Sequence, residues 1–262
     1  MPVFSSLPMY TEPACIREAS EAFIDAVFER LGIAGQQLPP DDLYAQWTDP
    51  DLLFSQSCGY PVMTRLQERV QVVATPCYAL PGCQGNQHSS FIVVRADDVR
   101  ATLADFRGSK IVLNALDSNS GMNLLRQEVA PLAERGRFFG EVKVSEAHVN
   151  SLVLISQGDA ELSAIDAVTW GYLERYAPER LKDVRCLQQT ALTPALPIIT
   201  ALHRSAEECE QVLAALNAVL QERPQLAETL AITGFVPASL EDYHSILQAK
   251  HNAVAAGYPI VA

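Results

Sequence analysis

The chain has 262 residues, of which 48% are apolar and 19% are charged, below the roughly 25% of charged residues in an average soluble domain. The 19 Lys and Arg residues are outnumbered by 31 Asp and Glu residues, and the net charge of −12 argues against the basic surface that nucleic-acid binding requires. No apolar run approaches the 18 or more residues of a membrane-spanning helix. We therefore expect a soluble protein of one or two domains with a large core and no nucleic-acid partner.

The N-terminal residues MPVFSSLPMYTEP lack the basic start and the apolar stretch of an export signal, so the sequence as written predicts a cytoplasmic protein. Six cysteines are scattered without a C-x-x-C pair, which excludes a zinc knuckle and a thioredoxin-like motif. Cys77 and Cys83 flank a Pro-Gly turn, and whether they form a disulfide stays open. We expect reduced thiols, no bound metal and no cofactor.

Strands and helices alternate along the first part of the chain, a pattern that favours sheets covered by helices. The predicted elements are strand 3–10, a helix from Pro13 that ends at Gly32, strand 52–55, a helix that begins near Pro61, and strands 70–74 and 91–95. Gly32 occupies the position of a C-cap glycine, and Pro61 is acceptable in a first helical turn.

The same alternation begins again after Asp97. The predicted elements are a short helix near Leu103, strand 111–114, a helix through Leu125 and Leu132, strand 142–145, helix 148–157, strand 162–165, helix 167–176, and strands 184–187 and 197–201. Two helices follow, one after residue 205 and one over 240–255; Ser205 and Glu208 form an S-x-x-E capping box at the start of the first.

Two α/β lobes are the simplest arrangement of these elements, each with a mainly parallel sheet flanked by helices. The second lobe is inserted into the first, with residues 91–97 and 184–200 as the two crossings. We assign residues 1–94 and 190–262 to the first lobe and residues 95–189 to the second. Ligands in such folds bind where strand ends meet helix N-termini.

Polar residues follow three successive predicted strands of the second lobe. Ser118, Asn119 and Ser120 precede one helix, His148 begins the next, and Asp166 precedes the third. Small polar side chains and backbone N–H groups at helix starts form anion sites without lysine, because the helix dipole is positive there. Helix capping alone is the alternative for each cluster. Together they predict one polar rim at the edge of a parallel sheet.

In the first lobe, aromatic and polar residues also lie close to strand ends. Tyr10 and Tyr60 can line a ligand or belong to the core, and His88 precedes strand 91–95. Cys58, with His148 and Asp166, has the residue types of a nucleophile, a base and an orienting acid, which leaves a thiol enzyme as an alternative. No known catalytic signature surrounds Cys58.

Several segments in order carry a resemblance to a known family: HSSFIVVRADD, TLADFRGSKIVLN, DSNSG, FFGEVKVSEAH, SQGDAELSAIDAVTW and PALPIIT. They resemble the phosphonate- and phosphite-binding proteins of ABC importers, which have the type II periplasmic-binding-protein fold. The earlier segments SLPMY and LLFSQSCGYP resemble a subgroup of that family.

The resemblance implies a two-lobed, non-enzymatic protein that closes over a small oxyanion-bearing ligand such as a phosphonate, phosphite or phosphate. It implies an ABC transporter permease as partner and a periplasmic location if the sequence has been trimmed; we expect a monomer. The implied ligand-binding residues are Ser118, Asn119, Ser120, His148, Asp166, His88, Tyr60 and Tyr10. Asn119 and His88 depart from the family pattern, which has a hydroxyl residue and a tyrosine there. A sulfonate or heteroaromatic ligand, a cytosolic sensor and an enzyme on the same scaffold remain the alternatives.

Overall fold

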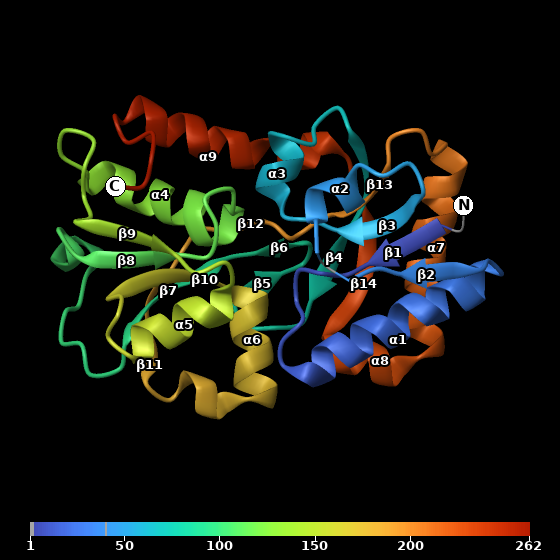
Figure 1. The fold of residues 1–262 in the computed structure, drawn as a ribbon, viewed down its shortest axis with the longest axis horizontal. Helices are drawn as coiled ribbons and strands as arrows, with labels where there is room; N and C mark the ends of the chain where they lie inside the picture. Colours follow the sequence, from blue (N-terminus) through green and yellow to red (C-terminus); the bar gives the residue numbers. More distant parts are fainter. Residues whose placement is uncertain (1–2, 40) are drawn as a thin grey trace. The chain divides into compact units, whose positions relative to one another are not determined.

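The computed structural model describes residues 3–39 and 41–262 and divides the chain into two compact units. Unit 1 comprises Met1–Ala79, Cys83–Gln87 and Pro194–His244, and unit 2 comprises Leu80–Gly82, His88–Thr193 and Ser245–Ala262. Both units are α/β (Figure 1). None of the helices in the described part of the chain has the length and apolar character that crossing a bilayer demands.

Unit 1 contains a six-stranded sheet in the order β14-β4-β13-β3-β1-β2. Its strands are β1 (Val3–Ser6), β2 (Gly35–Gln37), β3 (Leu52–Gln56), β4 (Val70–Tyr78), β13 (Ile198–Ala201) and β14 (Ile232–Pro237). Its helices are α1 (Ala14–Leu31), α2 (Leu43–Trp47), α3 (Gly59–Met63), α7 (Ala206–Glu222) and α8 (Pro224–Leu230), with a 3₁₀ turn at Leu240–Tyr243.

Helices cover the sheet of unit 1 on both faces (Figure 1). Helices α1, α7 and α8 pack together on one face. Trp47 of α2 and Val62 of α3 belong to a core cluster with Phe4 and Leu52 on the other face. Successive side chains of a strand point to opposite faces of the sheet. Because helices cover both faces here, the neighbouring residues Leu52 and Leu53 of β3 are both buried.

Unit 2 contains a five-stranded sheet in the order β11-β7-β10-β8-β9. Its strands are β7 (Ser90–Arg95), β8 (Lys110–Leu113), β9 (Glu141–Val144), β10 (Leu162–Asp166) and β11 (Val184–Gln189). Its helices are α4 (Leu124–Val129), α5 (His148–Ser156), α6 (Ala167–Tyr176) and α9 (His244–Ala255), with shorter helical turns at Leu103–Phe106, Asn119–Asn123, Ala130–Leu132 and Pro178–Leu181. Helix α4 lies on one face of the sheet, and α5 and α6 lie on the other (Figure 1).

Both large sheets are mixed rather than mainly parallel. In unit 2, β10 pairs with β8 and β8 pairs with β9 in parallel, whereas β7 runs antiparallel to β10 and β11. In unit 1, β1 is parallel to β2 and β3, but β13 and β4 pair antiparallel with their neighbours. The predicted parallel βα units are therefore present, and antiparallel strands extend each sheet.

The unit boundaries differ from those expected in sequence analysis. Residues 88–94 lie in unit 2 because β7 is a central strand of its sheet. Residues 245–262 also lie in unit 2, where the Ala262 carbonyl accepts the N–H groups of Phe138 and Phe139 at 2.7 and 3.0 Å. The chain passes between units near β6 (Gln87–His88) and β12 (Thr193–Pro194), which form a small sheet with β5 (Cys83–Gln84).

Most predicted elements are confirmed within a few residues. Helix α1 ends at Gly32 with φ of 67°, as a left-handed C-cap requires, and α7 begins with the Ser205–Glu208 capping box. Sequence analysis missed α2, α8, β14 and the strands of two or three residues. None of the six cysteines, all of which lie in the described residues, forms a disulfide, and Cys77 and Cys83 therefore do not pair.

Candidate functional site

The three polar clusters of unit 2 follow three neighbouring parallel strands. Ser118 follows β8, His148 follows β9, and Asp166 is the last residue of β10. The sheet order β10-β8-β9 and the parallel pairing place the carboxyl ends of these strands at one edge. This edge is where helix N-termini and strand ends meet in α/β folds that bind ligands.

Ser118 caps a π-helical turn, Asn119–Asn123, which continues into α4. Its Oγ accepts the Gly121 N–H at 3.0 Å, and its carbonyl accepts the Asn123 N–H at 3.0 Å. Ser118, Asn119 and Ser120 are all buried. The first turn of a helix leaves backbone N–H groups without intrahelical partners, so this turn offers donors to an anion.

The side chain of Asn119 is part of a buried network inside unit 2. Its Nδ2 donates to Thr193 Oγ1 at 3.1 Å, and its Oδ1 accepts from Asn123 Nδ2 at 2.9 Å. Asn123 also donates to the Ile246 carbonyl at 3.1 Å and accepts from Arg126. The Asn119 amide therefore ties the turn of residues 118–123, here called the anion turn, to its surroundings.

His148 begins α5 and contacts the neighbouring anion turn. Its Nε2 lies 3.2 Å from Ser120 Oγ, and its Nδ1 is enclosed by protein. Burial lowers the pKa of His148 and His88 lowers it further, whereas Asp166 and the Ala164 backbone act in the opposite direction. The net pKa is below the ordinary value, so the imidazole is neutral near pH 7 and its Nε2 can donate or accept.

His88 and Asp166 form a buried pair close to His148. His88 Nδ1 and Asp166 Oδ2 lie 3.2 Å apart, and both side chains are almost fully buried. Asp166 Oδ1 also accepts the Val168 N–H at 2.8 Å and so caps α6. Burial alone would raise the pKa of Asp166, but the attraction of His88 and His148 and the Val168 N–H together lower it below its ordinary value. Asp166 therefore remains a carboxylate.

Two further residues of this region, Asn114 and Gly121, were not singled out as site residues from sequence. An ideal Cβ on Gly121 would lie 1.8 Å from Asn114 Oδ1 and 3.1 Å from His148 Cε1. Asn114 Oδ1 is buried without a hydrogen-bond partner. Glycine at position 121 thus allows the Asn114 amide and the His148 ring to approach the same turn, and the DSNSG segment was the signal that could have revealed it.

The other predicted site residues lie in unit 1. Tyr10 is buried and packs edge-to-face on Tyr78, with ring centroids 5.9 Å apart. Tyr60 is buried in α3, where its carbonyl accepts from Thr64 Oγ1 at 2.7 Å. Cys58 is buried and is the N-cap residue of α3. The structure brings six of the eight predicted ligand residues together in unit 2 and places the two tyrosines in unit 1.

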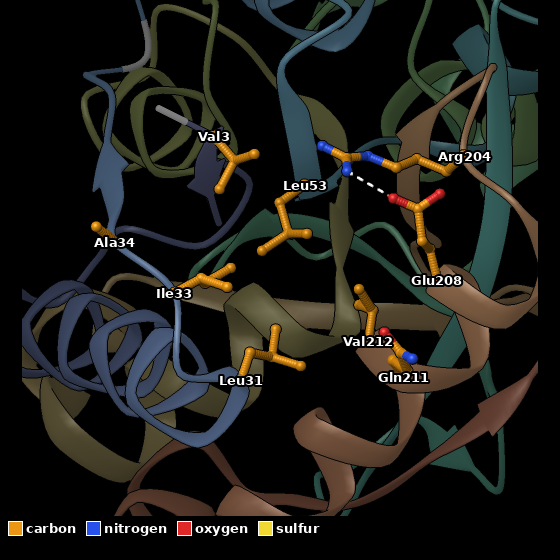
Figure 2. Close-up of a pocket in the computed structure, with 9 residues that line it drawn as sticks. All are labelled: Val3, Leu31, Ile33, Ala34, Leu53, Arg204, Glu208, Gln211 and Val212. Atoms are coloured by element: carbon orange, nitrogen blue, oxygen red, sulfur yellow. Dashed lines mark hydrogen bonds and ion pairs between the residues drawn. The ribbon is translucent and has the colours of Figure 1, made fainter. Parts of the chain in front are cut away.

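Unit 1 also has a hollow of about 340 Å³ between α1 and α7. Figure 2 shows its largely aliphatic wall, to which Leu31, Leu53 and Val212 contribute, and the Arg204–Glu208 ion pair at its rim. Arg204 Nη1 and Glu208 Oε1 are 2.9 Å apart, so the cation already has an anionic partner. The hollow lies in unit 1, apart from the polar clusters that follow the strands of unit 2. In the described residues, no group of three or more His, Cys, Asp and Glu side chains has an arrangement that could hold a metal ion.

Comparison with known proteins identifies one family. The sequence model of the family described as "ABC transporter, phosphonate, periplasmic substrate-binding protein" matches residues 7–243. A search of curated protein sequences finds no match.

Solved structures with the same fold include several binding proteins. A binding protein component of an ABC phosphonate transporter from Pseudomonas aeruginosa has a TM-score of 0.81 at 14% identity, over 97% of this chain and 87% of that chain. PhnD1 from Prochlorococcus marinus, solved in complex with methylphosphonate, has a TM-score of 0.76 at 14% identity, over 96% and 97%. A Xanthomonas citri protein bound to ATP has a TM-score of 0.71 at 16% identity, over 97% of each chain. At these identities the likeness establishes the two-lobed fold.

Proposed function

Because the chain belongs to the phosphonate substrate-binding protein family of ABC transporters, we propose that it binds a small oxyanion-bearing ligand, a phosphonate, phosphite or phosphate, at the unit 2 edge. Its activity is binding without turnover, its location is the periplasm, and its partner is an ABC transporter permease. The proposed ligand contacts are the turn of Ser118, Asn119 and Ser120, with His148 and the His88–Asp166 pair beside it. Tyr10 and Tyr60 are proposed as aromatic contacts from unit 1.

One observation carries the proposal: the Ser120 hydroxyl and the His148 Nε2 meet at 3.2 Å where two helices begin. Each group donates or accepts as its partner requires, and the adjacent N–H groups of the first helical turn are donors. An oxyanion bound here receives charge-assisted hydrogen bonds, each of which contributes about 1.5–3 kcal/mol. Local donors therefore hold an anion despite the net charge of −12, because distant exposed charges are screened over about 8–10 Å.

Isothermal titration calorimetry with phosphite, phosphate, methylphosphonate and methanesulfonate tests the proposal directly. We expect at least one of these oxyanions to bind, and we expect His148→Ala to weaken its binding by about 10- to 150-fold, the equivalent of one charge-assisted hydrogen bond. The matched control is His203→Ala, because His203 is exposed and lies in unit 1. The proposal fails if none of the oxyanions binds, or if His148→Ala binds the ligand as tightly as the wild type.

A further inference from the structure

The His88–Asp166–His148 cluster imposes a charge requirement on any anion bound beside it. Asp166 is buried and its pKa is lowered, so it brings one negative charge to within contact distance of His88. The turn of residues 118–123 contains no charged side chain, and the guanidinium of Arg126 donates to the Pro259 carbonyl and to Asn123. An oxyanion at Ser120 therefore adds a second negative charge close to the Asp166 carboxylate, whereas the Arg126 cation contacts the turn at its last residue, Asn123.

The His148 imidazole is the group in this cluster that can compensate the added negative charge, because its Nε2 lies 3.2 Å from Ser120 Oγ. Two titratable side chains lie near His148, Asp166 at the end of β10 and His88 in β6, and they shift its pKa in opposite directions. The N-terminal position of His148 on α5 also disfavours its positive charge, because the helix dipole is positive there. In the ligand-free protein these effects, together with burial, keep the ring neutral. A ligand anion at Ser120 adds an attraction that favours a positive ring.

Building on the proposed function, we propose that the site takes its oxyanion together with one proton, which moves from solvent to the His148 imidazole beside the His88–Asp166 pair. No bond of the ligand breaks, and the bound state contains the anion, the Asp166 carboxylate and one additional imidazolium charge. The ligand class is accordingly a fully deprotonated oxyanion, and the proton that compensates its charge is taken up from solvent by the protein. Affinity for such an anion falls as pH rises above neutrality, by up to tenfold per pH unit where one proton is linked to binding.

Proton uptake is measured by titrating phosphite and methylphosphonate at about pH 7.5 in buffers with different ionisation enthalpies. The slope of observed enthalpy against buffer enthalpy gives the number of protons bound, after correction for the ionisation of the free ligand. We expect the wild-type protein and the control variant His203→Gln to bind as much as one proton for each ligand bound. The variant His148→Gln keeps a hydrogen-bond donor but cannot become cationic. Its proton uptake should therefore be at most half that of the wild-type protein.

Nuclear magnetic resonance of ¹⁵N-histidine-labelled wild-type protein provides a second readout that needs no variant in the site. We expect the ring nitrogens of one buried histidine to change from the neutral to the imidazolium pattern when phosphite is added. Binding with no proton uptake and with neutral rings would overturn this inference while leaving the proposed function intact. Absence of binding by every oxyanion would overturn both.

Discussion

Gly121 provides a direct test of how the anion turn is packed. Replacing it with alanine would place a Cβ 1.8 Å from Asn114 Oδ1, 2.8 Å from Asn114 Cγ and 3.1 Å from His148 Cε1. Contact at 1.8 Å is impossible, so the Asn114 amide must move, and the His148 ring must shift by a few tenths of an ångström. Gly121 has no left-handed φ, so the perturbation is steric and does not arise from backbone strain.

The magnitude follows from two opposing contributions. Overpacking a buried site costs about 1–3 kcal/mol. Alanine in place of glycine within a helix recovers about 0.5–1 kcal/mol of unfavourable backbone entropy. We therefore expect Gly121→Ala to lower the free energy of unfolding by up to about 2.5 kcal/mol. We also expect it to weaken oxyanion binding about tenfold or more, because the His148 ring is displaced from its contact with Ser120.

Urea unfolding and calorimetric titration with the oxyanion that binds wild type measure the two effects. The control is Gly234→Ala in β14, where the new Cβ would lie 3.6 Å from Asn217 Oδ1, an ordinary contact. The double variant Gly121→Ala with Asn114→Ala should recover part of the lost stability, because the closest clash is removed. Wild-type affinity and stability for Gly121→Ala would refute the packing described here.

Two further predictions concern buried polar groups. Because the folded pKa of Asp166 lies below its ordinary value, its contribution to stability is complete above about pH 4 and is lost as pH falls further. Asp166→Asn should therefore flatten the dependence of the unfolding free energy on pH below about 4, and parallel curves for variant and wild type would contradict the role of the His88 contact. Tyr243→Phe removes a buried hydroxyl that lies 2.6 Å from Thr75 Oγ1 and donates to the Ala195 carbonyl at 2.9 Å. Its urea unfolding should show a loss of about 1–3 kcal/mol, and an unchanged midpoint would mean that water replaces these bonds without cost.

Local signals in the sequence were sufficient to predict most helices and strands. The Ser205–Glu208 capping box and the Gly32 C-cap each depend on a few adjacent residues, and both are present in the structure. Polar residues after three successive strands likewise predicted that Ser118, His148 and Asp166 share one sheet edge, because parallel strands end on the same side.

Only the tertiary structure decided which polar groups pair with each other. His88 meets Asp166 because β7 runs antiparallel to β10, a pairing that local periodicity does not encode. Asn119 is directed to Thr193, a residue 74 positions away, and so belongs to the buried network of the turn. Other long-range hydrogen bonds hold residues 245–262 in unit 2, from Asn123 to the Ile246 carbonyl and from Phe138 to the Ala262 carbonyl. Caps and periodicity are set by neighbours along the chain, whereas the partners of a buried side chain depend on sheet order and on which strands run antiparallel.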